Sequence, residues 1–143
     1  MKLELAVLAD FASLTQDGKL NILGIFHEVN PPMLPFPLPQ LYLVTSFEAE
    51  SEDYGKQRLI RVVLREENDV GAEMLAIEGL AQVPQPTRSG EIVLVNHVLG
   101  LSGVTFERAG AYEFSISVDG EGKAAVSLRV TDVADDPRGD PNV

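Results

Sequence analysis

The segment that decides the fold class is Gly110–Val130, GAYEFSISVDGEGKAAVSLRV. Apolar side chains occupy every second position in both of its halves: Tyr112, Phe114, Ile116 and Val118, then Val126, Leu128 and Val130. A side-chain period of two predicts a strand with one buried face, and the glycine-rich turn between the halves predicts a hairpin. We expect the alternate residues to form an ordinary solvated face: Glu113, Ser115, Ser117 and Arg129.

Runs of the same kind cover most of the chain and are separated by turn residues. They follow one another at the spacing of about 8–12 residues that is typical of sandwiches and barrels. The clearest are 20–29, 41–50, 57–67, 73–83 and 91–101. The sequence therefore predicts an all-β protein, an antiparallel β-sandwich of about eight strands with an Ig-like or jelly-roll-like topology.

The length of 143 residues fits one ordinary domain with a core of its own. We expect a single sandwich domain over residues 1–131. Residues 132–143, DVADDPRGDPNV, are acidic and have little to bury, so a flexible C-terminal tail is expected there. The sequence contains no cysteine, which excludes disulfide frameworks, zinc ribbons, iron–sulfur sites and thiol nucleophiles.

The formal net charge of −11 bears on the class of partner. A surface of this sign repels a phosphate backbone, so neither nucleic acid nor an anionic membrane is an expected partner. The N-terminal residues carry Glu4 and Asp10 and lack the apolar stretch of a signal peptide, and no run reaches the length of a membrane span. These features predict a cytoplasmic protein.

Two predicted strands carry more apolar surface than a two-layer sandwich buries. In 20–29 and in 91–101, apolar residues occupy both faces, whereas a sandwich strand normally turns its second face to water. We therefore expect these strands to be central or covered on both sides. The cover is either another segment of the chain or a second subunit.

The segment NPPMLPFPLPQ at residues 30–40 holds five of the nine prolines. Proline has no backbone N–H and a fixed φ, so we expect an extended, polyproline-like crossover and not an inner strand. Its apolar residues either present a rod to a partner or fold back over the second face of LNILGIF, residues 20–26. The second alternative is favoured because an open apolar strip promotes aggregation.

Residues 5–26, LAVLADFASLTQDGKLNILGIF, resemble the beginning of a family of small bacterial proteins of unknown function, in which an LAD element precedes GKLNILGIF. The likeness continues more weakly through the proline segment and into GAYEFSISVDG. The resemblance implies a β-sandwich and no established activity. Its motifs mark the fold and not reactive groups, so no functional residue is carried over from it.

The two histidines, His27 and His97, are the candidates for a metal site. If their strands pair, both imidazoles lie on one face, and a cupin-like centre would add a carboxylate such as Glu28 or Glu91. Glu28, however, directly follows His27 and points to the opposite face of a strand. The clustered spacing of a metal motif is absent, which favours structural or interfacial histidines and no cofactor.

Aspartates at predicted turns are the candidates for calcium, which takes six to eight oxygen ligands from flexible loops. Aspartate is also common in turns because its side chain bonds the local backbone, and no D-x-D-x-D-G loop is present. The aspartates concerned are Asp17, Asp53, Asp69, Asp119, Asp135 and Asp136. The serines lack a G-x-S-x-G elbow, and DGEGK lacks the Walker spacing, so neither predicts catalysis.

Two classes of function therefore remain open. The leading hypothesis is a non-enzymatic sandwich module that binds a protein partner or assembles with itself. The alternative is a metal- or small-ligand-binding sandwich, cupin-like or calcium-dependent, a class that includes enzymes. The side chains expected to form an interaction surface are Leu23, Ile25, Met33, Phe36, Val93 and Val95.

Overall fold

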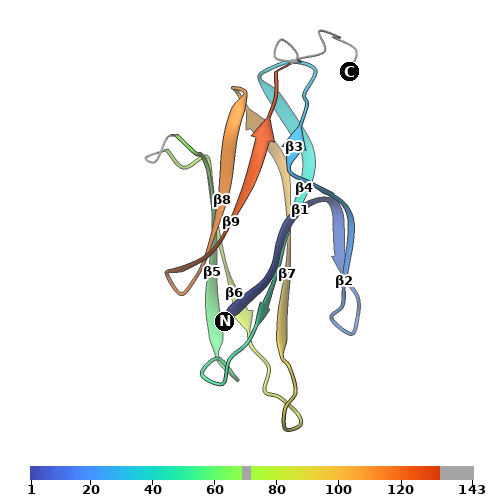
Figure 1. Cartoon of the computed structure of the whole chain (residues 1–143), viewed down its shortest axis with the longest axis vertical. Helices are drawn as coiled ribbons and strands as arrows, with labels where there is room; N and C mark the ends of the chain where they lie inside the picture. Colours follow the sequence, from blue (N-terminus) through green and yellow to red (C-terminus); the bar gives the residue numbers. More distant parts are fainter. Residues whose placement is uncertain (69–71, 133–143) are drawn as a thin grey trace.

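The computed structural model describes residues 1–68 and 72–132, and within them the chain forms nine strands and no helix. The strands form a four-stranded sheet, β2-β1-β4-β7, and a five-stranded sheet, β3-β9-β8-β5-β6, as Figure 1 shows. Their bounds are β1 Lys2–Leu14, β2 Leu20–Phe26, β3 Glu28–Val29, β4 Phe36–Glu48, β5 Gln57–Glu66, β6 Leu75–Gln82, β7 Leu94–Phe106, β8 Gly110–Val118 and β9 Glu121–Val130.

The topology is that of an immunoglobulin-like sandwich. All strand pairs are antiparallel except that of β3 with β9. β4 and β7 pair in one sheet as strands B and E do in immunoglobulin domains, and β5, β8 and β9 take the places of C, F and G in the other. The all-β sandwich expected from the sequence is confirmed, and the strand order identifies it as Ig-like and not as a jelly roll.

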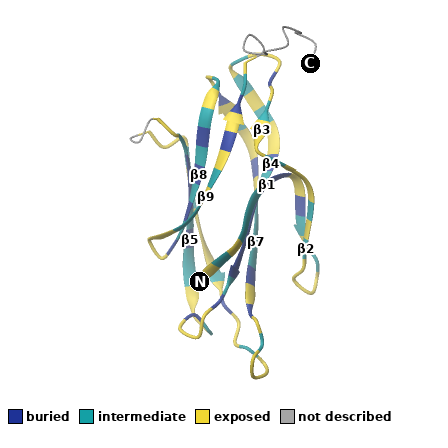
Figure 2. Cartoon of the chain, viewed as in Figure 1, coloured by how far each residue is buried: buried dark blue, intermediate teal, exposed yellow. Residues whose placement is uncertain are grey.

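The core lies between the sheets and draws on both. Its largest fully buried side chains include Phe47 and Phe106 from the four-stranded sheet and Tyr112 and Phe114 from the five-stranded sheet. The decisive hairpin forms as predicted, because β8 pairs with β9 from Gly110↔Val130 to Val118↔Glu121. Figure 2 shows the resulting alternation of buried and more exposed residues along β8 and β9.

The outer faces of the two sheets differ in chemistry. In the five-stranded sheet, the register places Arg61 opposite Ser117 and Glu78, and Arg65 opposite Glu113, so this face is charged and polar. Outward positions in the four-stranded sheet are mainly apolar: Leu5, Val7, Ala9 and Phe11 in β1, Leu23 and Ile25 in β2, Tyr42 and Val44 in β4, and Leu94 and Val98 in β7. The apolar surplus expected from the sequence therefore belongs to one sheet.

Part of this apolar face is covered by the hairpin of β1 and β2. The pairing of β1 with β4 ends at Ala9, and β1 then bends away from the sheet (Figure 1). At the hairpin tip, the carbonyl of Gly18 accepts a hydrogen bond of 2.9 Å from Nδ2 of Asn96 in β7. β1 also contacts β7, although β4 lies between them in the sheet. Val44, an outward residue of β4, is fully buried.

Two expectations about these segments are wrong. The run 20–29 is not central and is not covered by the rest of the described chain, because β2 is an edge strand in which Leu23 and Ile25 are 64% and 63% exposed; cover by a second subunit stays a prediction. The expected cover by the proline segment is likewise absent from the described structure, because these two side chains remain open. Apolar residues on both faces fit an exposed patch as well as a buried strand.

The proline segment differs in a second way from its expected role as a crossover. Pro37 and Pro39 lie inside β4, a strand that has neighbours on both sides. They are tolerated because β1 reaches only Tyr42, so residues 36–40 pair with β7 alone and form a local edge where a missing N–H costs nothing. The acidic tail lies outside the described residues, apart from Asp132.

Candidate functional site

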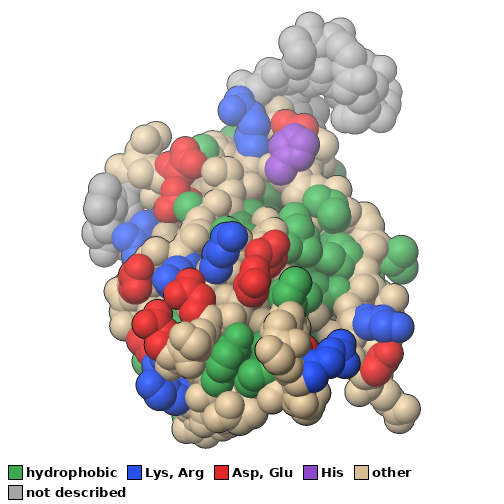
Figure 3. All heavy atoms as spheres, turned by 60° about the horizontal axis from the view of Figure 1, so that its bottom comes forward, with side chains coloured by type: hydrophobic (Ala, Val, Ile, Leu, Met, Phe, Trp, Pro, Cys, Tyr) green, Lys and Arg blue, Asp and Glu red, His purple; other side chains and the backbone are tan. Residues whose placement is uncertain are grey.

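Large exposed apolar side chains lie next to one another on the β1–β2 hairpin. Phe11 pairs directly with Leu23, and Ile25 lies two positions further along the same face of β2. Phe11 is 47% exposed and packs edge-on against Tyr42, with ring centroids 5.5 Å apart. Phe11, Leu23 and Ile25 are called the hairpin patch below. Figure 3 shows hydrophobic side chains gathered on one part of the molecular surface beside a region of mixed charge.

The other predicted interaction residues lie in different surroundings. Met33, in the link between β3 and β4, is 69% exposed, whereas Phe36 at the start of β4 is half-buried opposite Phe106. Val93 and Val95 belong to the core, with 6% and 8% exposure, so neither is accessible to a partner of the folded chain. In β7 it is Leu94, and not its neighbours, that faces outward.

The two histidines lie far apart in the fold. His27 follows β2 at one edge of the four-stranded sheet, and His97 lies in β7 at the other edge, with β1 and β4 between them. Burial lowers the pKa of His97, whose backbone lies opposite that of Thr45. Within residues 1–68 and 72–132, no three histidine or carboxylate side chains come close enough together to hold a metal ion.

The described turn aspartates bind their own surroundings. Asp17 accepts a hydrogen bond from Thr15, and Asp119 accepts one of 2.8 Å from the amide of Leu59 and pairs with Arg58. Asp69, Asp135 and Asp136 lie outside the described residues. The turn aspartates are therefore used, as far as the structure describes them, for local backbone and ion-pair contacts.

Asp53 is the buried member of this set, with 3% exposure. It accepts hydrogen bonds from the Met1 amino group (2.6 Å), the Glu50 amide (2.8 Å) and Nε of Arg58 (2.9 Å). Burial alone would raise the pKa of Asp53, but these bonds and the nearby positive charge outweigh it and hold the pKa below its usual value. Sequence reasoning singled out Asp53 but missed its strongest partner, because Met1 lies 52 residues away in the chain.

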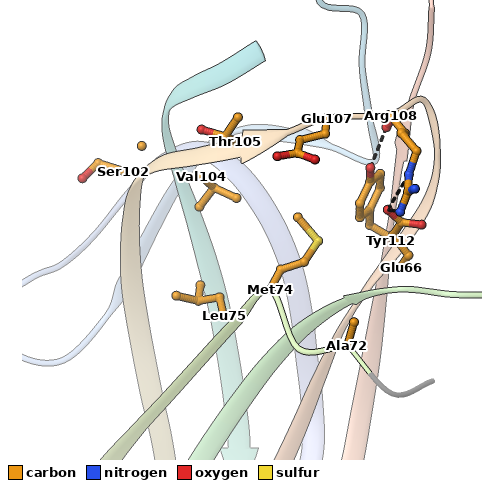
Figure 4. Close-up of a pocket in the computed structure, with 11 residues that line it drawn as sticks. Glu66, Ala72, Met74, Leu75, Ser102, Val104, Thr105, Glu107, Arg108 and Tyr112 are labelled. Atoms are coloured by element: carbon orange, nitrogen blue, oxygen red, sulfur yellow. Dashed lines mark hydrogen bonds and ion pairs between the residues drawn. The ribbon is translucent and has the colours of Figure 1, made fainter. Parts of the chain in front are cut away.

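A cavity of about 520 Å³ opens between the sheets where β7 faces residues 72–75, and sequence reasoning did not predict it. Its lining comes from Glu66 and the stretch 72–75, from the distant stretch 102–108, and from Tyr112. In Figure 4 the side chain of Met74 points into the space bounded by Val104, Glu107 and Tyr112. No motif could have revealed it, because it exists only through the packing of the two sheets.

One wall of the cavity is fixed by Tyr112. Its hydroxyl donates a hydrogen bond of 2.5 Å to the carbonyl of Arg108 (Figure 4). Its ring packs edge-on against Phe106, with ring centroids 4.8 Å apart. Immunoglobulin-like sandwiches use the same device, a tyrosine near the start of strand F that bonds the backbone a few residues upstream. The Arg108 guanidinium in turn donates to Oε1 of Glu66 at 2.8 and 3.2 Å.

Comparison with known proteins places the chain in a family without an assigned activity. No curated protein matches it. Among the described residues, none forms a helix that could span a membrane. The model of a family of unknown function, DUF6941, matches residues 4–131, which is nearly the whole described chain and agrees with the resemblance seen at residues 5–26. The chain is therefore a member of the DUF6941 family.

Proposed function

We propose that this chain is a non-catalytic protein-interaction module that associates with a second copy of itself through the hairpin patch. The observation that carries the proposal is the exposure of Leu23 and Ile25, at 64% and 63%, side by side on an edge strand. Contiguous exposed apolar side chains of this kind commonly mark protein interfaces.

Charge supports a second copy as the occupant. The chain carries a net charge of −11, so two copies repel each other over most of their surfaces. The strand Leu20–Phe26, LNILGIF, contains no charged residue. Two copies related by a twofold axis can therefore bring this strand together without placing like charges face to face, and a twofold interface uses the same patch on both subunits.

The test compares two matched substitutions of exposed apolar residues by glutamate. Leu23→Glu places a charge in the hairpin patch, and Ile92→Glu places the same charge at an apolar side chain of similar exposure, 67%, in the β6–β7 connection. We expect the native mass of the Leu23→Glu protein to fall to that of one chain, while Ile92→Glu keeps the mass of two. Light scattering coupled to size-exclusion chromatography measures both.

Stability measurements show whether the effect is specific. Both side chains are exposed, so each substitution should change the free energy of unfolding of the single chain by no more than about 0.5 kcal/mol. A monomeric Ile92→Glu protein would remove the special role of the hairpin patch. A Leu23→Glu protein with an undiminished mass would show that the two copies meet elsewhere.

A further inference from the structure

The cavity beside Tyr112 has the size of a small-molecule site. Its volume of about 520 Å³ lies within the range of ligand pockets. It lies at the edge of the sandwich, between β7 of one sheet and residues 72–75, which lead into β6 of the other. None of its lining residues belongs to the hairpin patch, so a ligand here would bind independently of self-association.

The lining of the cavity is partly apolar, and two of its apolar residues are held in place by the core. Met74, Leu75 and Val104 supply the apolar lining, and the last two also pack against the core. Gly103, with a φ of +71°, has open space where a side chain would begin. At Gly103 the alternation of β7 changes phase, because Leu101 and Phe106 both face the core although they are five residues apart.

The rim of the cavity carries an excess of negative charge. Both guanidinium nitrogens that Arg108 uses bind one oxygen of Glu66, so this pair is neutral overall. Glu107 lies on the same rim, exposed and without an ion pair among the described residues (Figure 4). A ligand that enters the cavity therefore meets one unneutralised carboxylate at its mouth, in a chain that is itself strongly acidic.

We infer that the cavity binds a small organic cation, with an apolar body on Met74, Leu75 and Val104 and a charged amine at Glu107. Burial of the apolar body provides most of the affinity, and the ammonium–carboxylate pair selects the sign of the charge. An anion of the same shape would have to displace Glu66 from Arg108 and would face Glu107.

Three probes that share a six-carbon chain separate these contributions: n-hexylammonium, 1-hexanol and hexanoate. For ligands of this size we expect a Kd on the order of 1 mM for the ammonium, a higher Kd for the alcohol and the highest Kd for the carboxylate. Chemical shifts of the Met74 methyl group and the Gly103 amide, followed by NMR during titration of the whole chain, report binding at the site itself.

Variants test the two parts of the site separately. Glu107→Gln should raise the Kd of n-hexylammonium by up to about fivefold and leave the Kd of 1-hexanol unchanged, because only the charge pair is lost. Glu107→Lys should reverse the order of ammonium and carboxylate. Met74→Trp should fill the cavity and weaken all three probes at least about tenfold. Leu94→Trp, at an exposed apolar position of β7 that does not line the cavity, is the matched control.

Each other outcome overturns the inference. If none of the probes shifts the two resonances at about 10 mM, the cavity is not a ligand site for such molecules. If hexanoate binds the unmodified protein more tightly than n-hexylammonium, the assignment of a cation is wrong. If Leu94→Trp weakens binding as much as Met74→Trp, the probes bind elsewhere.

Discussion

Replacing Tyr112 with Phe removes one oxygen atom from the corner where β7 crosses to β8. The ring of Tyr112 is 1% exposed and stays packed against Phe106 in the variant. What is lost is the 2.5 Å hydrogen bond to the carbonyl of Arg108, which lies four residues upstream in the turn between the sheets. The substitution therefore isolates the contribution of this hydrogen bond from that of aromatic packing.

The size of the effect follows from the burial of the two groups. A typical hydrogen bond contributes about 1 kcal/mol net, and leaving a partly buried carbonyl without its donor costs about 1–3 kcal/mol. We expect Tyr112→Phe to lower the free energy of unfolding by about 1–2 kcal/mol. With a urea m-value of about 2 kcal/mol/M for a domain of this size, the midpoint of unfolding should fall by roughly 0.5–1 M.

Urea unfolding followed by circular dichroism measures this shift, and Tyr42→Phe provides the control. Tyr42 lies on the outer face of β4, and its hydroxyl makes no hydrogen bond within the described structure. We expect the control to unfold within about 0.5 kcal/mol of the unmodified protein. Equal midpoints for Tyr112→Phe and the unmodified protein would refute the structural role assigned to this hydroxyl.

Three further predictions concern other parts of the fold. Asp53→Asn leaves the positively charged Met1 amino group and Arg58 without their negative partner, and it should lower the free energy of unfolding in urea at pH 7 by about 3 kcal/mol. Because the pKa of Asp53 is lowered in the fold, this contribution to stability is present above about pH 4 and is lost as the pH falls through the folded pKa. Burial, followed by the charge of Glu66, raises the pKa of Tyr112. The difference in unfolding free energy between the unmodified protein and Tyr112→Phe should therefore be constant below about pH 10 and decrease at higher pH. Residue 24 has a φ of +70°, and Gly24→Ala would place its Cβ against the Asp10 carboxylate, so this variant should lose more than about 1 kcal/mol of unfolding free energy in thermal unfolding. Adding Asp10→Ala to the Gly24→Ala variant should remove the overlap with the carboxylate but not the backbone strain.

Alternation with a period of two was sufficient to predict most strands. In Gly110–Val130 it also predicted which residues face the core, because a hairpin with a short turn fixes its own register. The pattern fails at LNILGIF, residues 20–26, where apolar residues on both faces do not distinguish a covered strand from an exposed hairpin. That difference depends on where β1 bends, which is a property of the packed sheet.

Distance along the chain explains what sequence reasoning missed at the sites. The sequence pattern around Val93 and Val95 does not indicate which face of this segment is turned to the core. That face is set by pairing with β4, where Val95 lies opposite the buried Phe47. Pro37 and Pro39 were not expected in a strand because only the end of β1 makes that part of β4 an edge. The cavity depends in the same way on segments separated by tens of residues.

The native mass of the unmodified protein over a range of concentrations tests the central claim most directly. Static light scattering should give twice the chain mass of 15.5 kDa at high concentration, with a fall towards one chain mass on dilution. A mass of one chain at every concentration would contradict self-association through Leu23 and Ile25 and would leave the hairpin patch without its proposed partner.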